Sequence, residues 1–285
     1  MKIGLMFVNS GPFSAPDLFA HLVTTAEKCG FESLWSVEHV VIPAGYKSPY
    51  PYSASGKIPG GEDVPIPDPL LPLSFAAAIT TRIKLATGVL ILPQRHPIYV
   101  AKEVATLDVL SKGRMILGIG SGWLEEEFAS LGLDFHTRGA RTDESIKAMR
   151  ALWNENPSSY HGKHFSFGPV KMLPKPVQQG GVPIVVGGHS PAAARRAGRL
   201  GDGFFPAISD PAKLKELLAL MNSEAHKAGR DPRRIEISCM ARAKADHMKP
   251  LADVGVSRVV VGARGSDRDG VTRSLEEIAG ELIAR

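Results

Sequence analysis

Residues 2–37, KIGLMFVNSGPFSAPDLFAHLVTTAEKCGFESLWSV, form the stretch that decides the fold. Its apolar run 2–8 is typical of a buried strand, and Pro16 and Asp17 suit the first turn of a helix. A second strand pattern follows at residues 32–37. Strands joined through a helix pair in parallel, so the stretch predicts one strand–helix–strand unit.

The same alternation continues along the rest of the chain. Further strands are expected at residues 82–92, 114–118, 182–186, 203–205, 235–240 and 258–261. Further helices are expected at residues 98–110, 142–153, 191–200, 211–228, 246–253 and 271–284, with another starting at Leu124. Eight strands alternating with helices in 285 residues predict a closed (β/α)8 TIM barrel, a fold that needs roughly 250 residues. An open doubly wound sheet is the alternative.

Two insertions interrupt the repeat. Residues 40–69 are rich in Pro, Gly, Ser and Tyr and follow the second strand. In a barrel they are expected to lie over the C-terminal mouth as a lid or binding loop. Residues 156–181 include an alternating pattern at 160–167 that predicts a hairpin. No boundary divides the chain, so residues 1–285 are expected to form a single barrel domain.

The composition is that of an ordinary soluble globular protein, with 44% hydrophobic and 22% charged residues. The apolar run at 70–79 is too short to span a bilayer, and the N-terminus lacks a signal-peptide pattern, so a cytoplasmic location is expected. Cys29 and Cys239 predict two buried thiols rather than a disulfide framework. A net charge of +5 from scattered basic residues favours a solvated surface over nucleic-acid binding. A basic mouth for a phosphorylated small molecule stays open.

The candidates for chemistry are the residues that follow each strand, because a barrel places its active site there. The second strand ends in Glu38-His39, a carboxylate beside an imidazole. Histidine titrates near neutrality and can donate to or accept from a bound ring. Glu38 and His39 are therefore the predicted catalytic residues, and a histidine at a polar barrel rim is the structural alternative.

Glycines mark the ends of the third and fourth strands. A glycine inside an apolar strand indicates a bulge or the close approach of another backbone or a ligand. Glycines after the fourth strand allow a flat ligand to lie against bare backbone, but the acidic run 125–127 argues against a dinucleotide fingerprint. The candidate cofactor-binding residues at these two ends are Thr87, Gly88, Val89, Gly120, Ser121 and Gly122.

The run GGHSP at 187–191 predicts an anion site after the fifth strand. Its two glycines turn the chain into a helix N-terminus, where backbone N–H groups bind phosphate well. Gly187, Gly188 and His189 are the candidate phosphate-binding residues, and a plain helix cap is the alternative. Three arginines add positive charge nearby: Arg195, Arg196 and Arg199. No metal site is predicted, because the pair His161 and His164 has no third ligand close by.

In this order and spacing, these segments resemble the luciferase-like monooxygenase superfamily, and most closely its branch of deazaflavin (coenzyme F420)-dependent oxidoreductases. The resemblance covers residues 2–206 and is weaker beyond. The segments that carry it are GFESLW (30–35), Glu38-His39, RIKLATGV (82–89), RHP (95–97), LDVLSKGR (107–114), GIGSGW (118–123), RGARTDE (138–144), Gly187-Gly188 and AGRLGDG (197–203).

The resemblance implies a barrel with a flavin-type ring at its mouth. His39 matches the active-site histidine beside the ring, and Glu38 the neighbouring acidic position. Gly88-Val89 matches a bulge behind the ring, whose peptide is cis in deazaflavin members. The remaining matches are Ser121 and Gly122, at positions that contact the ring or the cofactor tail, and Gly187, Gly188 and His189, in the phosphate loop.

The resemblance predicts hydride transfer between F420 and a small organic substrate. The alternative is an FMN-dependent monooxygenase that receives reduced flavin from a partner reductase. A non-catalytic flavin-binding protein is less favoured, because it needs no titratable pair such as Glu38 and His39. Trp123 stands where sugar-phosphate dehydrogenases of the superfamily have a glutamate, which argues against a sugar-phosphate substrate. A homodimer is expected by analogy with the family.

Overall fold

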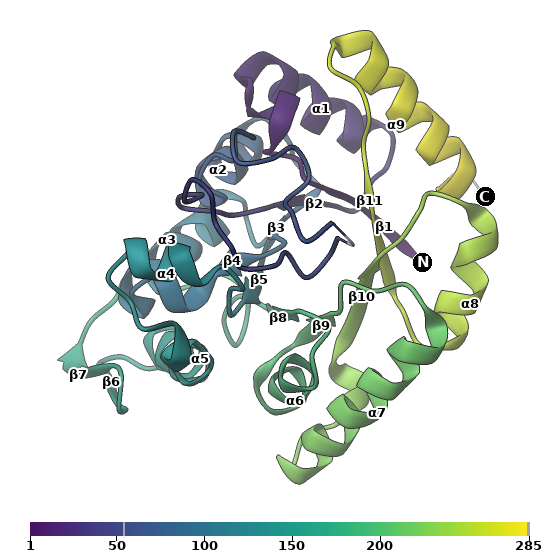
Figure 1. Cartoon of the computed structure of the whole chain (residues 1–285). Coiled ribbons are helices and arrows are strands. Elements are labelled where there is room, and N and C mark those ends of the chain that lie inside the picture. The colour runs from purple at the N-terminus through teal and green to yellow at the C-terminus, as the bar shows by residue number, and fades with distance from the viewer. Residues whose placement is uncertain (54, 284–285) are drawn as a thin grey trace.

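The structure, a computed structural model, describes residues 1–53 and 55–283. The barrel strands are β1 (Lys2–Met6), β2 (Ser33–Ser36), β3 (Lys84–Thr87), β4 (Leu90–Ile91), β5 (Met115–Gly120), β8 (Ile184–Gly187), β9 (Gly203–Phe205), β10 (Glu236–Met240) and β11 (Arg258–Gly262). They are all parallel, and their order is β3-β2-β1-β11-β10-β9-β8-β5. The ring closes because β5 also pairs with β3 (Figure 1). Since β4 continues the line of β3 along β5, the ring has eight strand positions, which confirms the predicted (β/α)8 barrel.

Helices surround the ring on its outside (Figure 1). They are α1 (Pro16–Lys28), α2 (Leu70–Ile79), α3 (Pro97–Leu110), α4 (Glu125–Ser130), α5 (Arg138–Asn154), α6 (Pro191–Leu200), α7 (Pro211–Lys227), α8 (Met248–Asp253) and α9 (Arg268–Leu282). An antiparallel hairpin of β6 (Ser158–His161) and β7 (Ser166–Val170) confirms the hairpin predicted in the second insertion. The long loop between β2 and α2 crosses the middle of the ring in Figure 1, as predicted for a segment over the mouth.

Two elements differ from the sequence prediction. Helix α2 was predicted only as an apolar run, because its residues are apolar on nearly every side and give no helical period. Its one proline, Pro72, lies in the first turn, where a helix tolerates it. The strand expected at residues 82–92 is divided into β3 and β4 by the peptide between Gly88 and Val89, which is cis.

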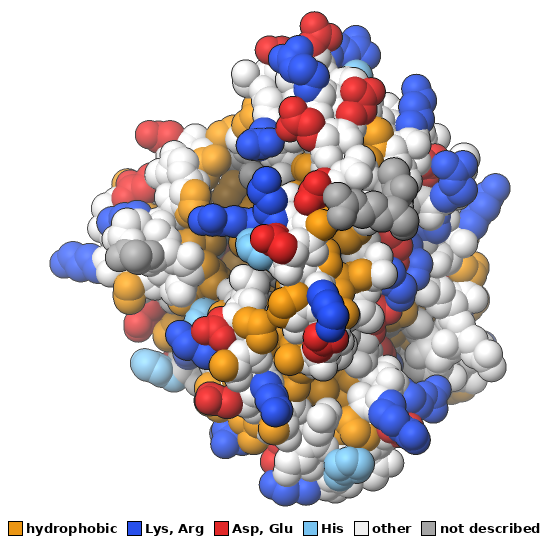
Figure 2. All heavy atoms as spheres, turned by 90° about the vertical axis from the view of Figure 1, so that its right-hand side faces the viewer, with side chains coloured by type: hydrophobic (Ala, Val, Ile, Leu, Met, Phe, Trp, Pro, Cys, Tyr) orange, Lys and Arg blue, Asp and Glu red, His pale blue; other side chains and the backbone are white. Residues whose placement is uncertain are grey.

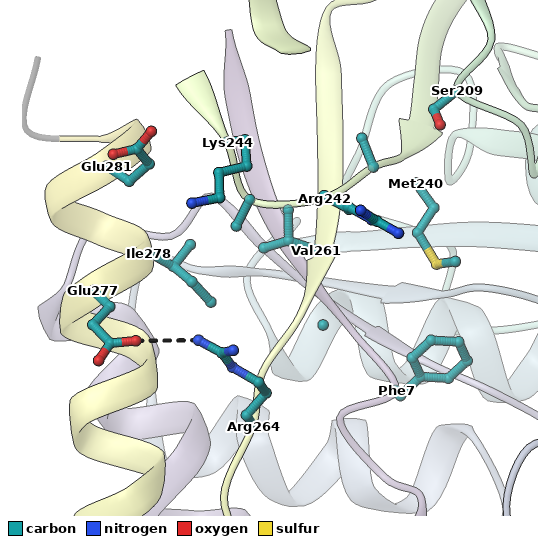
Figure 3. Close-up of a pocket in the computed structure, with 13 residues that line it drawn as sticks. Phe7, Ser209, Met240, Arg242, Lys244, Val261, Arg264, Glu277, Ile278 and Glu281 are labelled. Atoms are coloured by element: carbon teal, nitrogen blue, oxygen red, sulfur yellow. Dashed lines mark hydrogen bonds and ion pairs between the residues drawn. The ribbon is translucent and has the colours of Figure 1, made fainter. Parts of the chain in front are cut away.

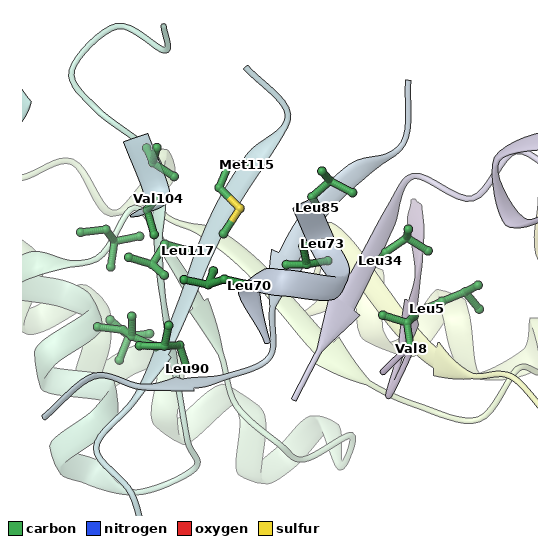
Figure 4. Packing of buried hydrophobic residues seen from close by; sticks show 14 of the residues in the cluster. Leu5, Val8, Leu34, Leu70, Leu73, Leu85, Leu90, Val104, Met115 and Leu117 are labelled. Carbon is green, nitrogen blue, oxygen red and sulfur yellow. The ribbon is translucent and has the colours of Figure 1, made fainter. Parts of the chain in front are cut away.

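The main core lies between the barrel strands and the helices. Figure 4 shows Leu70 and Leu73 of α2 facing Leu85 of β3 and Leu117 of β5, and all four side chains are buried. Burial of a leucine side chain contributes roughly 1.5–3 kcal/mol to stability. Helix α2 therefore forms because its apolar residues pack against the sheet, although its sequence lacks an amphipathic pattern.

A second, smaller core fills the inside of the barrel around Trp35, which is fully buried. Its indole N–H donates to Ser33 Oγ at 2.8 Å, and its ring meets Phe205 edge-on with 5.0 Å between centroids. Three glycines face this indole from neighbouring strand positions: Gly4, Gly88 and Gly118. A Cβ atom on them would lie 2.9, 3.1 and 3.4 Å from the nearest indole atoms, so all three glycines lie against the ring. A larger residue is also excluded at Gly4 by Ser33 Oγ, 2.5 Å from the Cβ position, and at Gly118 by Thr87 O, 1.8 Å from it.

Arg258 closes the barrel at the end opposite the mouth. Its side chain is 1% exposed, donates to both carboxylate oxygens of Glu32 at 2.8 and 2.9 Å, and pairs with Glu236. Burial opposes ionisation of Glu32, but the hydrogen bonds and charge of Arg258 prevail and lower the pKa of Glu32 to about 2. The guanidinium lies 5.6 Å from the centre of the Trp35 ring, so this ion pair supports the inner core.

Both cysteines are free thiols. Cys239 is fully buried, and burial raises its pKa to about 12. Cys29 is half-buried at the end of α1, so the prediction of buried thiols is right for Cys239 and only partly right for Cys29.

Across residues 1–53 and 55–283, no helix has both the length and the hydrophobicity needed to cross a bilayer.

Gly118→Ala should lower the free energy of unfolding by about 3 kcal/mol, because the new methyl group would overlap the carbonyl oxygen of Thr87. The control is Gly280→Ala in α9, where a Cβ meets nothing within 4 Å. It should be neutral or stabilise by up to about 1 kcal/mol, because alanine favours helices more than glycine does. Urea denaturation measures both, and equal stabilities would contradict the close packing inside the barrel.

Candidate functional site

The residues predicted to form the site lie along one arc of the mouth, the C-terminal end of the barrel. Glu38 and His39 follow β2, the Gly88–Val89 peptide follows β3, Ser121 follows β5, and Gly187 ends β8. These strands are consecutive in the ring, in the order β2-β3-β5-β8. The fold therefore brings together residues that are far apart in the sequence.

His39 is held by Glu127 of α4. Its Nδ1 lies 3.0 Å from Glu127 Oε2, and the two side chains are 9% and 1% exposed. Oε1 of Glu127 accepts the backbone N–H of Val40 at 2.7 Å and, more weakly, that of Val41 at 3.3 Å. A carboxylate in this setting is an acceptor, so Nδ1 carries the hydrogen. Nε2 has no hydrogen-bond partner in the described part of the chain and remains available to a ligand.

Glu127 therefore has two roles, which the sequence analysis missed. It sets the orientation of His39, and it fixes the first residues of the loop over the mouth. Glu126 fixes the same loop further along by accepting the N–H groups of Lys47 and Ser48 at 2.7 and 3.1 Å. The sequence signal was the acidic run at 125–127, which was interpreted only as a charge that repels a diphosphate.

Glu38 does not pair with His39, although the two are adjacent. Its side chain is 2% exposed and accepts hydrogen bonds from the guanidinium of Arg95 and from the N–H of Ile91. Arg95 also binds Asp68 at 2.6 Å, just before α2. Burial raises the pKa of Glu38, and the charge of Arg95 opposes that shift. Glu38 therefore ties β2 to β4 and α2 and presents no accessible oxygen to a ligand in the mouth.

The side chain of Val89 fills the space beside two of the predicted ligand-facing glycines. A Cβ on Gly120 would lie 2.6 Å from one methyl of Val89, and a Cβ on Gly187 would lie 2.5 Å from the other. These glycines therefore accommodate Val89 instead of offering bare backbone to a flat ligand. Thr87 is fully buried and donates its hydroxyl to Gly118 O at 2.6 Å. Val89 itself is half-exposed and forms an apolar bulge in the mouth.

Ser121 belongs to a network centred on Arg196 of α6. Its hydroxyl oxygen accepts from Arg196 Nη1 at 3.1 Å and lies 3.2 Å from Thr142 Oγ1. The single hydroxyl hydrogen of Thr142 goes to Arg138 O at 2.7 Å, so the Ser121 O–H is the donor between the two hydroxyls. Arg196 and Arg199 both bind Asp143. Two of the three arginines expected to favour an anion are thus already paired with carboxylates, since Arg199 also contacts Glu224 at 3.5 Å. The sequence analysis predicts Arg196 only as a positive charge near the phosphate loop, and it does not predict the contacts of Ser121 with Arg196 and Thr142.

The loop from β8 to α6 is only partly free to bind an anion. The N–H of Gly188 donates to Phe205 O at 3.1 Å, and Ser190 Oγ caps α6 by accepting the N–H of Ala193 at 3.2 Å. The backbone N–H groups of His189 and Ser190 have no partner in residues 1–53 and 55–283. His189 Nδ1 is likewise buried without a partner among those residues. Gly188 has a φ of +112°, a conformation that other residues rarely adopt.

Aromatic rings connect the two sides of this arc. Trp123 contacts His39 and two tyrosines of the long loop edge-on, with centroid distances of 5.7 Å to His39, 5.7 Å to Tyr46 and 5.2 Å to Tyr50. From the same loop, Tyr52 contacts His189 at 5.1 Å. The loop therefore reaches from β2 to the β8–α6 turn. Burial raises the pKa of Tyr50 to about 12, so its hydroxyl stays protonated and neutral at physiological pH.

Glu127→Ala should release the loop, because it removes the acceptor for His39 and for two backbone N–H groups. Stability should fall by about 2 kcal/mol, and chymotrypsin should cut after Tyr46 or Tyr52 about tenfold faster. The control is Glu125→Ala, which removes an exposed carboxylate from the same turn and should cost about 0.5 kcal/mol. Mass spectrometry of the fragments follows the digestion over time. Equal digestion rates for the two variants would show that Glu127 does not hold the loop in place.

Comparisons with known proteins identify the family. The sequence model of the luciferase-like monooxygenase family matches residues 6–253. Uncharacterized protein Rv0940c of Mycobacterium tuberculosis is 33% identical over 273 residues, which cover 93% of this chain and 94% of that protein. The F420-dependent glucose-6-phosphate dehydrogenase of Amycolatopsis mediterranei is 32% identical over 209 residues, which cover 72% of this chain and 57% of that enzyme.

A solved structure agrees with this assignment. The crystal structure of monooxygenase RslO1 from Streptomyces bottropensis superposes with a TM-score of 0.77 and 25% identity, and the match covers 99% of each chain. The match extends over the whole barrel, including the strands that carry the candidate site. The chain therefore belongs to the luciferase-like monooxygenase family and is an oxidoreductase, as its sequence resemblance predicted.

Proposed function

We propose that this oxidoreductase transfers a hydride between coenzyme F420 and a small organic substrate, with His39 as the group that handles the proton. The observation that carries the proposal is the His39–Glu127 pair, which holds a largely buried imidazole at the mouth with Nε2 unpaired in the described chain. The relative that uses F420, at 32% identity, supports the choice of cofactor.

The residues of the arc fit such a cofactor. Val89 offers an apolar bulge against which a flat ring can lie. On the same arc, His189 Nδ1 is a buried polar atom without a partner among residues 1–53 and 55–283. A buried polar atom of this kind is costly unless a ligand or water completes its hydrogen bond. We infer that His189 and the N–H of Ser190 hold the cofactor's phosphate.

The reduced deazaflavin supplies a hydride from a carbon that replaces the flavin N5. A hydride added to a polar double bond leaves a negative charge on the heteroatom, which then needs a proton. Protonated His39 can donate that proton from Nε2, while Glu127 keeps Nδ1–H in place and stabilises the imidazolium. Glu38 serves in this proposal as a buried support for the mouth, with its charge taken up by Arg95.

His39→Asn should lower turnover by about 10²-fold with little loss of stability. The asparagine amide can still donate to Glu127 near the position of Nδ1, but it has no group at Nε2. Turnover is followed by recovery of F420 fluorescence, with reduced F420 and a panel of aldehydes, ketones and enones. Unchanged turnover in this variant would show that Nε2 does not handle the proton.

Titration of the protein with F420 and with FMN tests the choice of cofactor. Tight binding of F420 alone supports the proposal, and tight binding of FMN alone contradicts it. The second candidate is an FMN-dependent monooxygenase supplied by a partner reductase, which the likeness to monooxygenase RslO1 favours. A stable complex with FMN, together with oxygen consumption when reduced FMN is supplied, is the result expected for that enzyme.

Gly188→Val should weaken F420 binding by at least about tenfold, because a branched side chain at a φ of +112° distorts the loop that carries His189 and Ser190. A phosphate-free analogue of the cofactor should lose much less affinity. The control is Gly229→Val, which imposes similar strain at a φ of +68° in the turn after α7. Equal loss for both ligands would mean that the loop does not bind the phosphate.

Two further expectations from the sequence remain proposals. A homodimer is supported by Leu71, Phe75 and Ile79, which repeat every fourth residue on α2 and are 71%, 45% and 37% exposed. A cytoplasmic location also remains a prediction.

A further inference from the structure

A hollow of about 790 Å³ opens on the part of the mouth that the proposed cofactor site does not use. It lies at the C-terminal ends of β1, β10 and β11, and one wall is α9 (Figure 3). In the ring, β1 is the next neighbour of β2, which carries His39. None of the candidate cofactor-binding residues lines this hollow. A molecule bound here would therefore lie beside the cofactor without occupying its site.

The hollow is apolar at its base. Phe7 and Met240 are 37% and 39% exposed, which is unusual for large apolar side chains at the end of buried strands. Val261 and Ile278 line the same space from β11 and α9. On this side of the barrel, Figure 2 shows a hollowed surface with hydrophobic side chains in its depth and Lys and Arg side chains at its edge. Exposed apolar surface in a concave site favours the binding of an apolar body.

The charged groups of the hollow are three cations and two carboxylates. Arg264 is already paired with Glu277 at 3.2 Å, as the dashed line in Figure 3 shows. Glu281 accepts the N–H of Ala245 at 2.8 Å. In contrast, neither Arg242 nor Lys244 forms a side-chain hydrogen bond or ion pair within the part of the chain that the structure describes.

Arg242 and Lys244 reach different parts of the hollow: Figure 3 shows Arg242 on the side of Met240 and Lys244 pointing toward α9. The N–H of Lys244 donates to Arg242 O at 2.8 Å, so the backbone makes a tight turn between them. Both side chains are exposed, while Ala243 between them is half-buried, so both cations lie at the open side of the hollow. The local excess of one positive charge suits a monoanion such as a carboxylate better than a doubly charged phosphate.

We propose that this hollow binds an organic molecule with an apolar body and one carboxylate. The body packs on Phe7 and Met240, and the carboxylate binds Arg242, while Lys244 adds positive charge at the same hollow. The inference rests on the proposed function in one respect: if the cofactor lies on the neighbouring arc as proposed, the molecule bound in the hollow is the substrate that faces it. A carboxylate can also belong to the cofactor tail, and we assign it to the substrate because no candidate cofactor-binding residue lines the hollow.

Isothermal titration calorimetry of the full chain with octanoate and octan-1-ol tests the inference. The two probes share an eight-carbon body and differ in the carboxylate. Octanoate should bind about tenfold more tightly than octan-1-ol. In the double variant Arg242→Gln/Lys244→Gln, the affinity for octanoate should fall to that for octan-1-ol. Met240→Gln should weaken both probes by similar factors, which locates their shared body in the hollow.

The matched control is Lys213→Gln/Lys215→Gln, which removes two exposed cations from α7, outside the hollow. It should keep the full preference for octanoate, so the effect of Arg242 and Lys244 is separated from that of net charge. Thermal unfolding of each variant checks that the barrel is intact. Equal binding of the two probes by the wild type, or a preference that survives the loss of Arg242 and Lys244, would overturn the proposal.

Titration with F420 separates this inference from the proposed function. The double variant should bind F420 like the wild type, and octanoate should still bind to the F420-loaded protein. Weaker F420 binding in the variant, together with competition by octanoate, would assign the hollow to the cofactor tail and overturn the substrate assignment. If the wild type binds no F420 but octanoate binding depends on Arg242 and Lys244, the cofactor proposal is wrong and the hollow stands as a carboxylate site.

Discussion

The indole of Trp35 is the constraint on which the inside of this barrel depends. It occupies the interior of the barrel, and three glycines lie against it: Gly4 of β1, Gly88 directly after β3 and Gly118 of β5. Because protein interiors are close-packed, the large indole ring and the glycines around it depend on each other. The hydrogen bond to Ser33 and the guanidinium of Arg258 keep the ring in a single position. The interior of the barrel at the end opposite the mouth is thereby filled by the ring and by the Arg258 ion pairs.

That packing also shapes the mouth above the indole. Gly88 lies against Trp35, and the next residue, Val89, rises toward the mouth and packs into the space left by Gly120 and Gly187. The glycines of four strands thus serve two successive layers, the indole below and the valine above. The upper layer is the apolar floor on which we place the cofactor ring. A barrel whose interior is filled in this way can hold such a floor without relying on the loops, which are the more variable parts of a fold.

The sequence predicts the barrel because each buried strand is an apolar run and the helices are marked by residues typical of helix ends. It did not predict α2, because an almost uniformly apolar helix has no period to detect. The candidate site was found in position but not in its contacts. Glu38 and His39 are adjacent, yet their partners are Arg95 and Glu127, and Glu127 is 88 residues beyond His39. The partner of a buried polar group depends on how distant elements pack, which no local pattern contains.

The two arcs of the mouth differ in how firmly their polar groups are held. On the arc of β2, β3, β5 and β8, three carboxylates are paired: Glu38 with Arg95, Glu127 with His39, and Asp143 with Arg196. Fixed groups suit a cofactor that is the same in every turnover, because preorganised dipoles need no rearrangement when it binds. On the arc of β1, β10 and β11, two cations are exposed and unpaired within the described residues. Under the proposed assignment of this arc to the substrate, a change of one or two residues there would alter which molecule binds without disturbing the paired arc, and the substrate could change while the chemistry stays the same.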